Sequence, residues 1–151
     1  MNNKIFFGII FISVVCLVGW VIYFVSRPTI TIVQFPNGQK IQVEVVSTDT
    51  ARERGLSNRD SIAEDQGMLF LFDVPGLYPF WMKDMRFSID LIWIQGDVVS
   101  GLIQNMPPEN PPVTNYRPKT PVDKVLELKS GAISAMNLKI GDKLDITTTK
   151  Q

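Results

Sequence analysis

The chain has 151 residues, of which 45% are hydrophobic, with 15 basic residues, 15 acidic residues, no histidine and a single cysteine. Without histidine, the chain cannot build a Ser-His-Asp triad, a Cys-His pair, a histidine-bound zinc site or a haem with an axial histidine. The single cysteine also excludes disulfides within the chain, so the stability of any domain must come from packing.

The N-terminal part of the chain contains an uncharged apolar run, IFFGIIFISVVCLVGWVIYFV, at residues 5–25. A helix of 21 residues spans roughly 30 Å, the thickness of a bilayer core. The run is longer than the apolar part of a cleaved signal peptide, and no small-x-small site follows it. Lys4 precedes it and Arg27 follows it, which favours weakly a cytoplasmic N-terminus. We therefore expect residues 1–27 to be an uncleaved single-pass membrane anchor.

The remaining residues, 28–151, are expected to form one domain, exposed outside the cytoplasm at the cell membrane. This part carries 13 basic and 15 acidic residues and therefore a net charge of −2. A nucleic-acid partner requires clustered positive charge, and no such cluster is found along this sequence. Nucleic acid is therefore not expected as a partner.

The first half of this domain reads as strands with one short helical segment. An Asn-Gly pair between two β-rich runs predicts a hairpin of residues 30–35 and 40–46. The segment 48–56 suits one or two helical turns, with Thr48 or Asp49 as the N-cap and Gly55 ending the helix in a left-handed conformation. The apolar run 68–72 predicts a strand that is buried on both faces.

The second half continues as strands around one proline-rich loop. Residues 106–121 contain six of the ten prolines and predict a long, stiff loop. A short helical turn or a bend is expected at 130–136. Further strands are predicted at residues 80–85, 89–94, 98–103, 125–128 and 144–147. About eight strands with almost no helix predict a mostly β fold, a small β-barrel or a jelly-roll-like sandwich with one or two short helices.

An ordered series of motifs resembles the bacterial and archaeal family known as domain of unknown function 192. The resemblance covers about residues 30–147 and rests on Arg52-Glu53-Arg54-Gly55-Leu56 with Arg59, Gly67-Met68-Leu69-Phe70-Leu71-Phe72, Phe80-Trp81-Met82-Lys83, Asp90-Leu91, Val125-Leu126-Glu127-Leu128 and Gly141-Asp142. The chain departs from the family pattern with Ser57 for Met, Asp84 for Asn, Met85 for Thr and Ser88 for Pro. The resemblance implies a compact barrel-like or jelly-roll-like β fold and implies no particular activity.

The charged residues of the FWMKDM segment are the candidate functional residues. If residues 80–85 form a strand, Lys83 lies on the face of Trp81 and Asp84 lies on the opposite face. Asp90 alternates with apolar residues, so we expect it to be at least partly buried and paired with Arg52, Arg59 or Lys83. The proposed ligand pocket consists of Arg52, Arg59, Trp81, Lys83, Asp84 and Asp90. The same charges could instead hold the fold together, which is the interpretation we prefer.

Other polar residues receive simpler interpretations. Glu44, Glu127 and Asp145 alternate with apolar residues and are expected on solvated strand faces. The acidic residues between 60 and 73 lack the spacing of a calcium loop, and neither a metal nor another cofactor is expected.

Three functions remain open from the sequence. The preferred one is a non-catalytic binding or interaction module of the cell envelope, with an envelope protein or a small molecule as its ligand. The first alternative is an envelope hydrolase that uses carboxylates, with a glycan as one candidate substrate. The second alternative is a structural accessory subunit of a membrane complex.

Overall fold

The computed structural model describes residues 29–109 and 114–150, so the predicted anchor at residues 5–25 and part of the proline-rich loop lie outside the described residues. No helix within the described ranges is long and apolar enough to cross a bilayer. Residues 30–148 form one compact unit.

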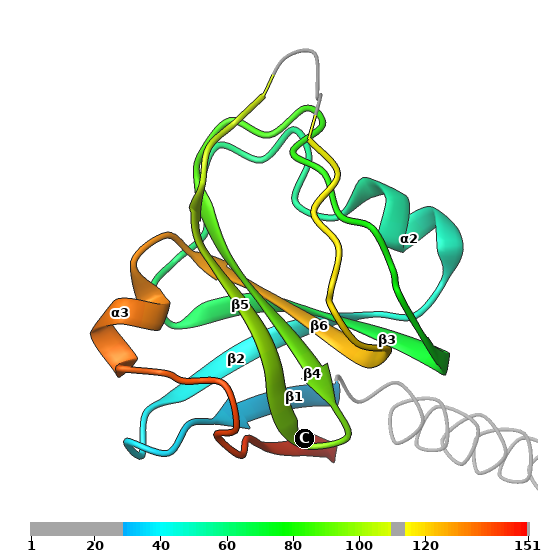
Figure 1. Ribbon diagram of the computed structural model, residues 1–151. Helices are drawn as coiled ribbons and strands as arrows, with labels where there is room; N and C mark the ends of the chain where they lie inside the picture. Colours follow the sequence, from blue (N-terminus) through cyan, green and yellow to red (C-terminus); the bar gives the residue numbers. More distant parts are fainter. Residues whose placement is uncertain (1–28, 110–113, 151) are drawn as a thin grey trace, which may run out of the picture. The chain divides into compact units, whose positions relative to one another are not determined.

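The unit contains seven strands and two short helices, which confirms the mostly β fold (Figure 1). The elements are β1 (Thr29–Gln34), β2 (Lys40–Val46), α2 (Asp49–Arg54), β3 (Gln66–Gly76), β4 (Ile89–Gln95), β5 (Val98–Met106), β6 (Val122–Lys129), α3 (Ala132–Met136) and β7 (Asp145–Lys150).

The strands form a single sheet in the order β5-β4-β6-β3-β2-β1-β7. The pairs β1–β2, β3–β6, β4–β5 and β4–β6 are antiparallel, whereas β2 and β3, which flank α2 in the chain, run parallel. Strands β5 and β7 stand at opposite ends of this order. An isolated bridge between Val98 and Lys143 joins β5 to the segment before β7. A single bridge outside β7 is not a strand pair, so within the described residues the sheet does not close into the barrel that the strand count suggested.

Both faces of the sheet are covered, because successive side chains of a strand point to opposite faces. One face packs against α3 through the α3-side core, which includes Leu69, Ile92, Ile94, Leu126, Leu128, Ile133 and Met136. The other face packs against α2 and the loops that follow it through the α2-side core, which includes Leu56, Met68, Phe70, Phe80, Met82, Leu91, Trp93 and Val125. In Figure 1 α3 lies at the left of the curved sheet and α2 at its upper right.

The helix α2 begins and ends at the residues that the sequence predicts. The Oγ1 atom of Thr48 accepts a hydrogen bond of 3.4 Å from the amide of Ala51, and Gly55 follows the helix at positive φ. With φ +49° and ψ −131°, however, Gly55 does not have the left-handed helical conformation that the sequence predicted. Six residues are too few for a stable isolated helix, so tertiary contacts must hold α2 in place.

The expected strand at residues 80–85 is wrong. Phe80 forms one isolated bridge with Tyr116, and the chain then runs as a loop with a turn in which Asp84 has φ +56°. Phe80 and Met82 are buried while Trp81 and Lys83 are exposed, so the alternation holds for residues 80–83, but the exposed Asp84 breaks it. A strand needs a neighbour along its whole length, and here only Phe80 has one.

Candidate functional site

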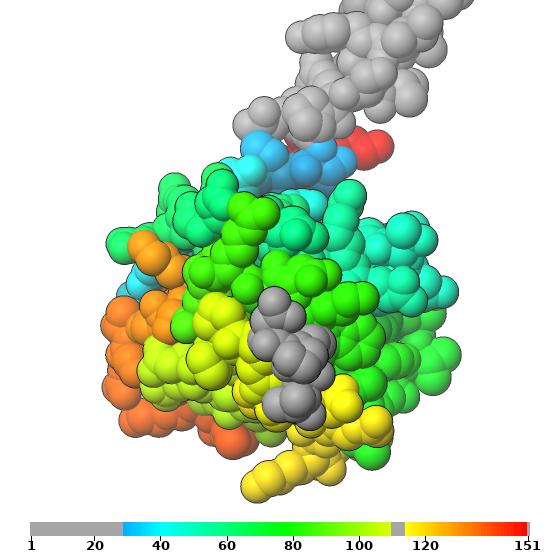
Figure 2. All heavy atoms as spheres, turned by 90° about the horizontal axis from the view of Figure 1, so that it is seen from above, coloured from blue at the N-terminus to red at the C-terminus, as the bar shows by residue number. Residues whose placement is uncertain are grey.

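A pocket of about 170 Å³ opens between α2, the end of β3 and the loop at residues 77–81. We call it the α2 pocket; it is lined by Arg52, Glu53, Arg54, Gly55, Leu56, Ser57, Phe70, Phe72, Tyr78, Pro79, Phe80, Trp81, Met85 and Glu127. Figure 2 looks down on the end of the molecule formed by α2 and the green loop that follows β3. Most of the lining is apolar, so its few polar groups decide which ligands fit.

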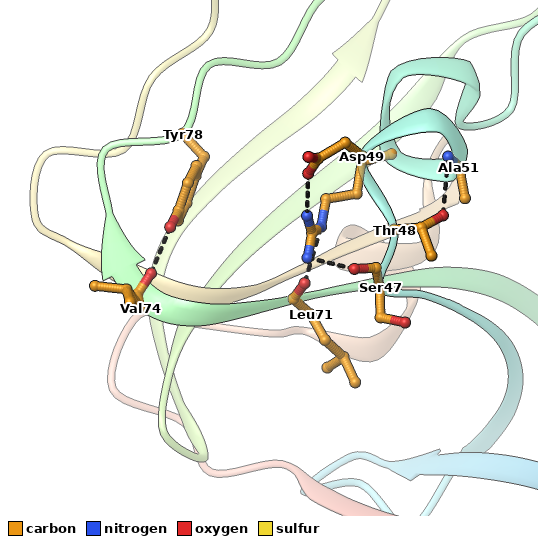
Figure 3. A network of polar contacts seen from close by, with 8 residues as sticks. Ser47, Thr48, Asp49, Ala51, Leu71, Val74 and Tyr78 are labelled. Carbon is orange, nitrogen blue, oxygen red and sulfur yellow. Dashed lines mark hydrogen bonds and ion pairs between the residues drawn. The ribbon is translucent and has the colours of Figure 1, made fainter.

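Arg52 fixes α2 to the sheet and forms one side of the pocket. Its Nε donates to the carbonyl of Leu71 at 3.0 Å, and its terminal nitrogens contact the Asp49 carboxylate at 2.7 Å and the Ser47 carbonyl at 2.6 Å. Figure 3 shows these contacts ending on the labelled residues Leu71, Asp49 and Ser47. The guanidinium also lies 4.8 Å from the centre of the Phe72 ring. Each of its three nitrogens therefore already donates to a group of the fold.

The aromatic walls are packed against one another before any ligand arrives. The rings of Phe72 and Tyr78 stack with centroids 3.7 Å apart, and the Tyr78 hydroxyl donates to the Val74 carbonyl. The rings of Phe70 and Phe80 meet edge to face at 5.0 Å. Trp81 is different, because its side chain keeps 39% of its surface exposed at the pocket. Trp81 is therefore the pocket aromatic with the largest exposed surface available to a ligand.

Glu127 of β6 is the most unusual polar residue of the pocket. It is only 6% exposed, and its Oε2 atom has no hydrogen-bond partner in the part of the chain that the structure describes. Burial raises the pKa of its carboxyl group to about 8, and the nearby charge of Arg59 offsets this only in part. At neutral pH the group is therefore mostly a neutral acid.

The expectation that Glu127 lies on a solvated strand face is wrong. The alternation along β6 is as predicted, because Leu126 and Leu128 point to the α3-side core and Glu127 points the other way. On that side, however, the turn after α2 covers the strand. A Cβ atom added at Gly55 would lie 3.8 Å from Oε2 of Glu127 and 3.5 Å from Cζ of Phe70. Both are ordinary van der Waals distances, so the positive φ of Gly55, and not a lack of space, is what favours glycine in the turn that covers Glu127.

Two of the six sequence-predicted site residues, Arg52 and Trp81, line the α2 pocket. Arg59 instead forms a surface ion pair of 2.7 Å with Glu44. Lys83 and Asp84 expose their side chains in the loop after Trp81. Their backbone carbonyls accept hydrogen bonds from the Ser57 hydroxyl and the Asn58 amide, both at 2.8 Å.

Asp90, the sixth residue, is fully buried as expected, but its partners are backbone amides rather than cations. Its Oδ1 accepts from the amide of Asn105 at 2.9 Å, and its Oδ2 accepts from the amide of Ile133 at 2.8 Å. Ile133 is the second residue of α3, so the carboxyl group holds the start of that helix. The predicted ion pair with Arg52, Arg59 or Lys83 is not formed. Asp90 lies on the same face of β4 as Ile92 and Ile94, which is the α3 side of the sheet and faces away from the α2 pocket.

Glu127, the central polar group of the pocket, was therefore not among the site residues predicted from the sequence. The sequence feature that could have indicated it is the glutamate within the apolar run Val125–Leu128. The same pattern is also typical of a strand with one face exposed to solvent, so it does not distinguish a buried from an exposed glutamate. Among the described residues, no group of three or more His, Cys, Asp or Glu side chains is arranged to hold a metal ion.

Comparisons with known proteins agree with this fold. A Sinorhizobium meliloti crystal structure, of a protein provisionally named a transcription regulator, matches with a TM-score of 0.70 and 26% identity over 80% of this chain and 95% of that one. A Novosphingobium aromaticivorans protein of unknown function matches with a TM-score of 0.69 and 26% identity over 77% of this chain and 83% of that one. A search of curated proteins gave no match. The model of the DUF192 family, described as an uncharacterized ACR, matches residues 32–146, and the chain belongs to this family.

Proposed function

We propose that this protein is a non-catalytic binding module of the cell envelope that takes a small molecule in the α2 pocket. The observation that carries the proposal is the buried Oε2 atom of Glu127, which lacks a hydrogen-bond partner among the described residues of an aromatic-lined pocket. A buried polar atom without a partner costs free energy, and a ligand that supplies the partner recovers it. Concave apolar sites with a few polar groups are the usual form of small-molecule sites.

Binding is preferred over hydrolysis because, among the described residues, the pocket lining contains only one buried carboxyl group, that of Glu127. Carboxylate-dependent hydrolases use two acids with different environments. Asp90 is committed to two backbone amides, and Asp84 is exposed in a loop. Glu53, the second acid of the pocket lining, is an exposed side chain of α2.

The cellular setting of the proposal rests on the sequence. The uncharged run at residues 5–25 would anchor the chain in the membrane, with the binding domain on the extracytoplasmic side. The regulator name of the Sinorhizobium protein would suggest nucleic acid as a partner. The net charge of −2 on residues 28–151 opposes that, because phosphate backbones are bound through positive charge.

Methionine methyl groups provide the test, because Met85 lines the pocket and Met136 belongs to the α3-side core. Full-length protein labelled with ¹³C-methyl methionine in lipid nanodiscs would be screened by NMR against neutral single-ring fragments. We expect a subset of fragments to shift the Met85 resonance in a saturable way and to leave Met136 unchanged. If no fragment shifts Met85, the proposal fails; if a bound fragment is converted to product, the module is an enzyme instead.

A further inference from the structure

The positive and negative charges around the α2 pocket are equal in number. Arg52 is paired with Asp49 at 2.7 Å, and Arg54 and Glu53 are both exposed in the pocket lining. Arg59, whose charge reaches Glu127, is paired with Glu44 outside the lining. A charged ligand would therefore find no net opposite charge around Glu127 while that carboxyl group is neutral.

A neutral carboxyl group has particular requirements as a binding partner. It offers one O–H donor and one carbonyl acceptor, whereas a carboxylate offers only acceptors. A hydroxyl group is both donor and acceptor, so one ligand hydroxyl can satisfy either oxygen of Glu127. An ammonium group would first require loss of the proton from Glu127, and burial opposes that loss.

The size of the pocket limits the rest of the ligand. An apolar cavity of about 150 Å³ is known to accept one benzene ring, so about 170 Å³ accommodates one six-membered ring. Substituents of the ring can extend toward an adjoining hollow of about 430 Å³, which shares Arg52, Phe72 and Tyr78 with the α2 pocket. Phe72 is covered on its two faces by Tyr78 and Arg52. Trp81, which lines the pocket and is 39% exposed, is therefore the aromatic residue against which we place such a ring.

We propose that the α2 pocket recognises an uncharged six-membered ring bearing a hydroxyl group, with the ring against Trp81 and the hydroxyl hydrogen-bonded to Glu127. This inference rests on the proposed binding function and names the ligand class. A phenolic ring and a pyranose share this chemistry, and both belong to the class.

The experiment compares four probes on the full-length protein in nanodiscs at pH 6.5, using the Met85 resonance to measure the dissociation constants. Phenol and methyl glucopyranoside represent the two sources of a ring hydroxyl, toluene lacks the hydroxyl, and benzylamine carries a positive charge. We expect phenol or the glucoside to bind about threefold to tenfold more tightly than toluene, the usual value of one neutral hydrogen bond. Whichever of these two binds more tightly identifies the source.

Two variants at one position separate the hydrogen bond from packing. Glu127→Gln keeps a donor and an acceptor, so the preference for the hydroxyl should persist within about threefold. Glu127→Leu removes both, so the hydroxyl ligand and toluene should bind equally. Unchanged Met136 resonances would show that each variant is folded.

The possible failures are distinguishable. If wild-type protein binds toluene as tightly as both hydroxyl probes, the ligand class is wrong while the binding function stands. If benzylamine binds most tightly, and more so as the pH rises, Glu127 acts as an ionised counter-ion and the inference is overturned. If none of the probes shifts Met85 and the wider fragment screen is also empty, the proposed function itself fails.

Discussion

Burial of Glu127 makes the stability of the domain depend on pH in a direction opposite to that of most paired carboxylates. The folded state holds the proton up to about pH 8, whereas an unfolded chain releases it near the ordinary value of 4.5. Between these values the folded state binds more protons, so the free energy of unfolding must fall as the pH rises. At about 1.4 kcal/mol per pH unit, the full span corresponds to roughly 5 kcal/mol, a large share of the 5–15 kcal/mol that is usual for a domain.

Glu127→Gln should remove this dependence, because glutamine is similar in size and does not ionise. We expect the variant to be close to wild type in stability at pH 5 and clearly more stable at pH 8. Urea unfolding of a chain that begins at Pro28, followed by tryptophan fluorescence at pH 5, 6, 7 and 8, would give the difference at each pH. A two-state transition of that chain is the condition for the comparison.

Glu53→Gln is the matched control, since Glu53 lines the same pocket but is exposed. Its free energy of unfolding should differ little from that of wild type at every pH. If the difference between wild type and Glu127→Gln stays constant from pH 5 to pH 8, Glu127 is not held as a neutral acid and the reasoning is refuted.

Three further predictions concern the fold and the anchor. Asp90→Ala leaves two buried amides without an acceptor and should lower the free energy of unfolding, measured in urea, by roughly 2–6 kcal/mol. Lys83→Met, at an exposed side chain, should change it by less than about 0.5 kcal/mol. Equal losses for the two variants would indicate that Lys83 and Asp90 form an ion pair after all. Gly55→Ala, at φ +49°, should cost about 1–3 kcal/mol in the same measurement, and a neutral result would show that the turn after α2 relaxes freely. The full-length protein should stay in the membrane pellet after alkaline carbonate extraction; release, or an N-terminus near residue 27, would show that residues 5–25 are peripheral or cleaved.

Local sequence signals predicted the elements whose formation depends on local chemistry. The Asn37-Gly38 turn sets the β1–β2 hairpin, and the predicted second strand, residues 40–46, has the bounds of β2. The ends of α2 were readable for the same reason, since Thr48 and Gly55 act within one turn of the chain.

The FWMKDM segment shows where such signals stop. Buried and exposed residues alternate from Phe80 to Lys83, but this alternation ends at Asp84 and does not supply a partner strand. Asp84 lies in the left-handed region, which a strand residue does not occupy. The family that the chain resembles has asparagine at this position, one of the residues most often found in that conformation.

The pocket could be predicted only in part for a related reason. Arg52 and Trp81 were identifiable as a charged and an aromatic residue in short motifs. Glu127 was not, because the period of β6 assigns it to a face without saying whether water or α2 covers that face. That information depends on the parallel connection from β2 through α2 to β3, which is a property of the topology.

The buried carboxyl groups of Asp90 and Glu127 differ in whether the fold itself supplies their hydrogen-bond partners. Asp90 has backbone amides on both oxygens, so its burial is compensated within the fold and any ligand would have to break those bonds. Glu127 lies on the opposite face of the sheet with an oxygen that has no partner in the described residues, next to a space that holds one small ring. If packing alone governed this position, an apolar residue would be more stable there. The free-energy cost of burying Glu127 therefore has its simplest explanation in a ligand that supplies the missing hydrogen bond. The Glu127→Leu variant should be more stable than wild type but unable to select a hydroxyl ligand, which would show that stability is traded for binding at this position.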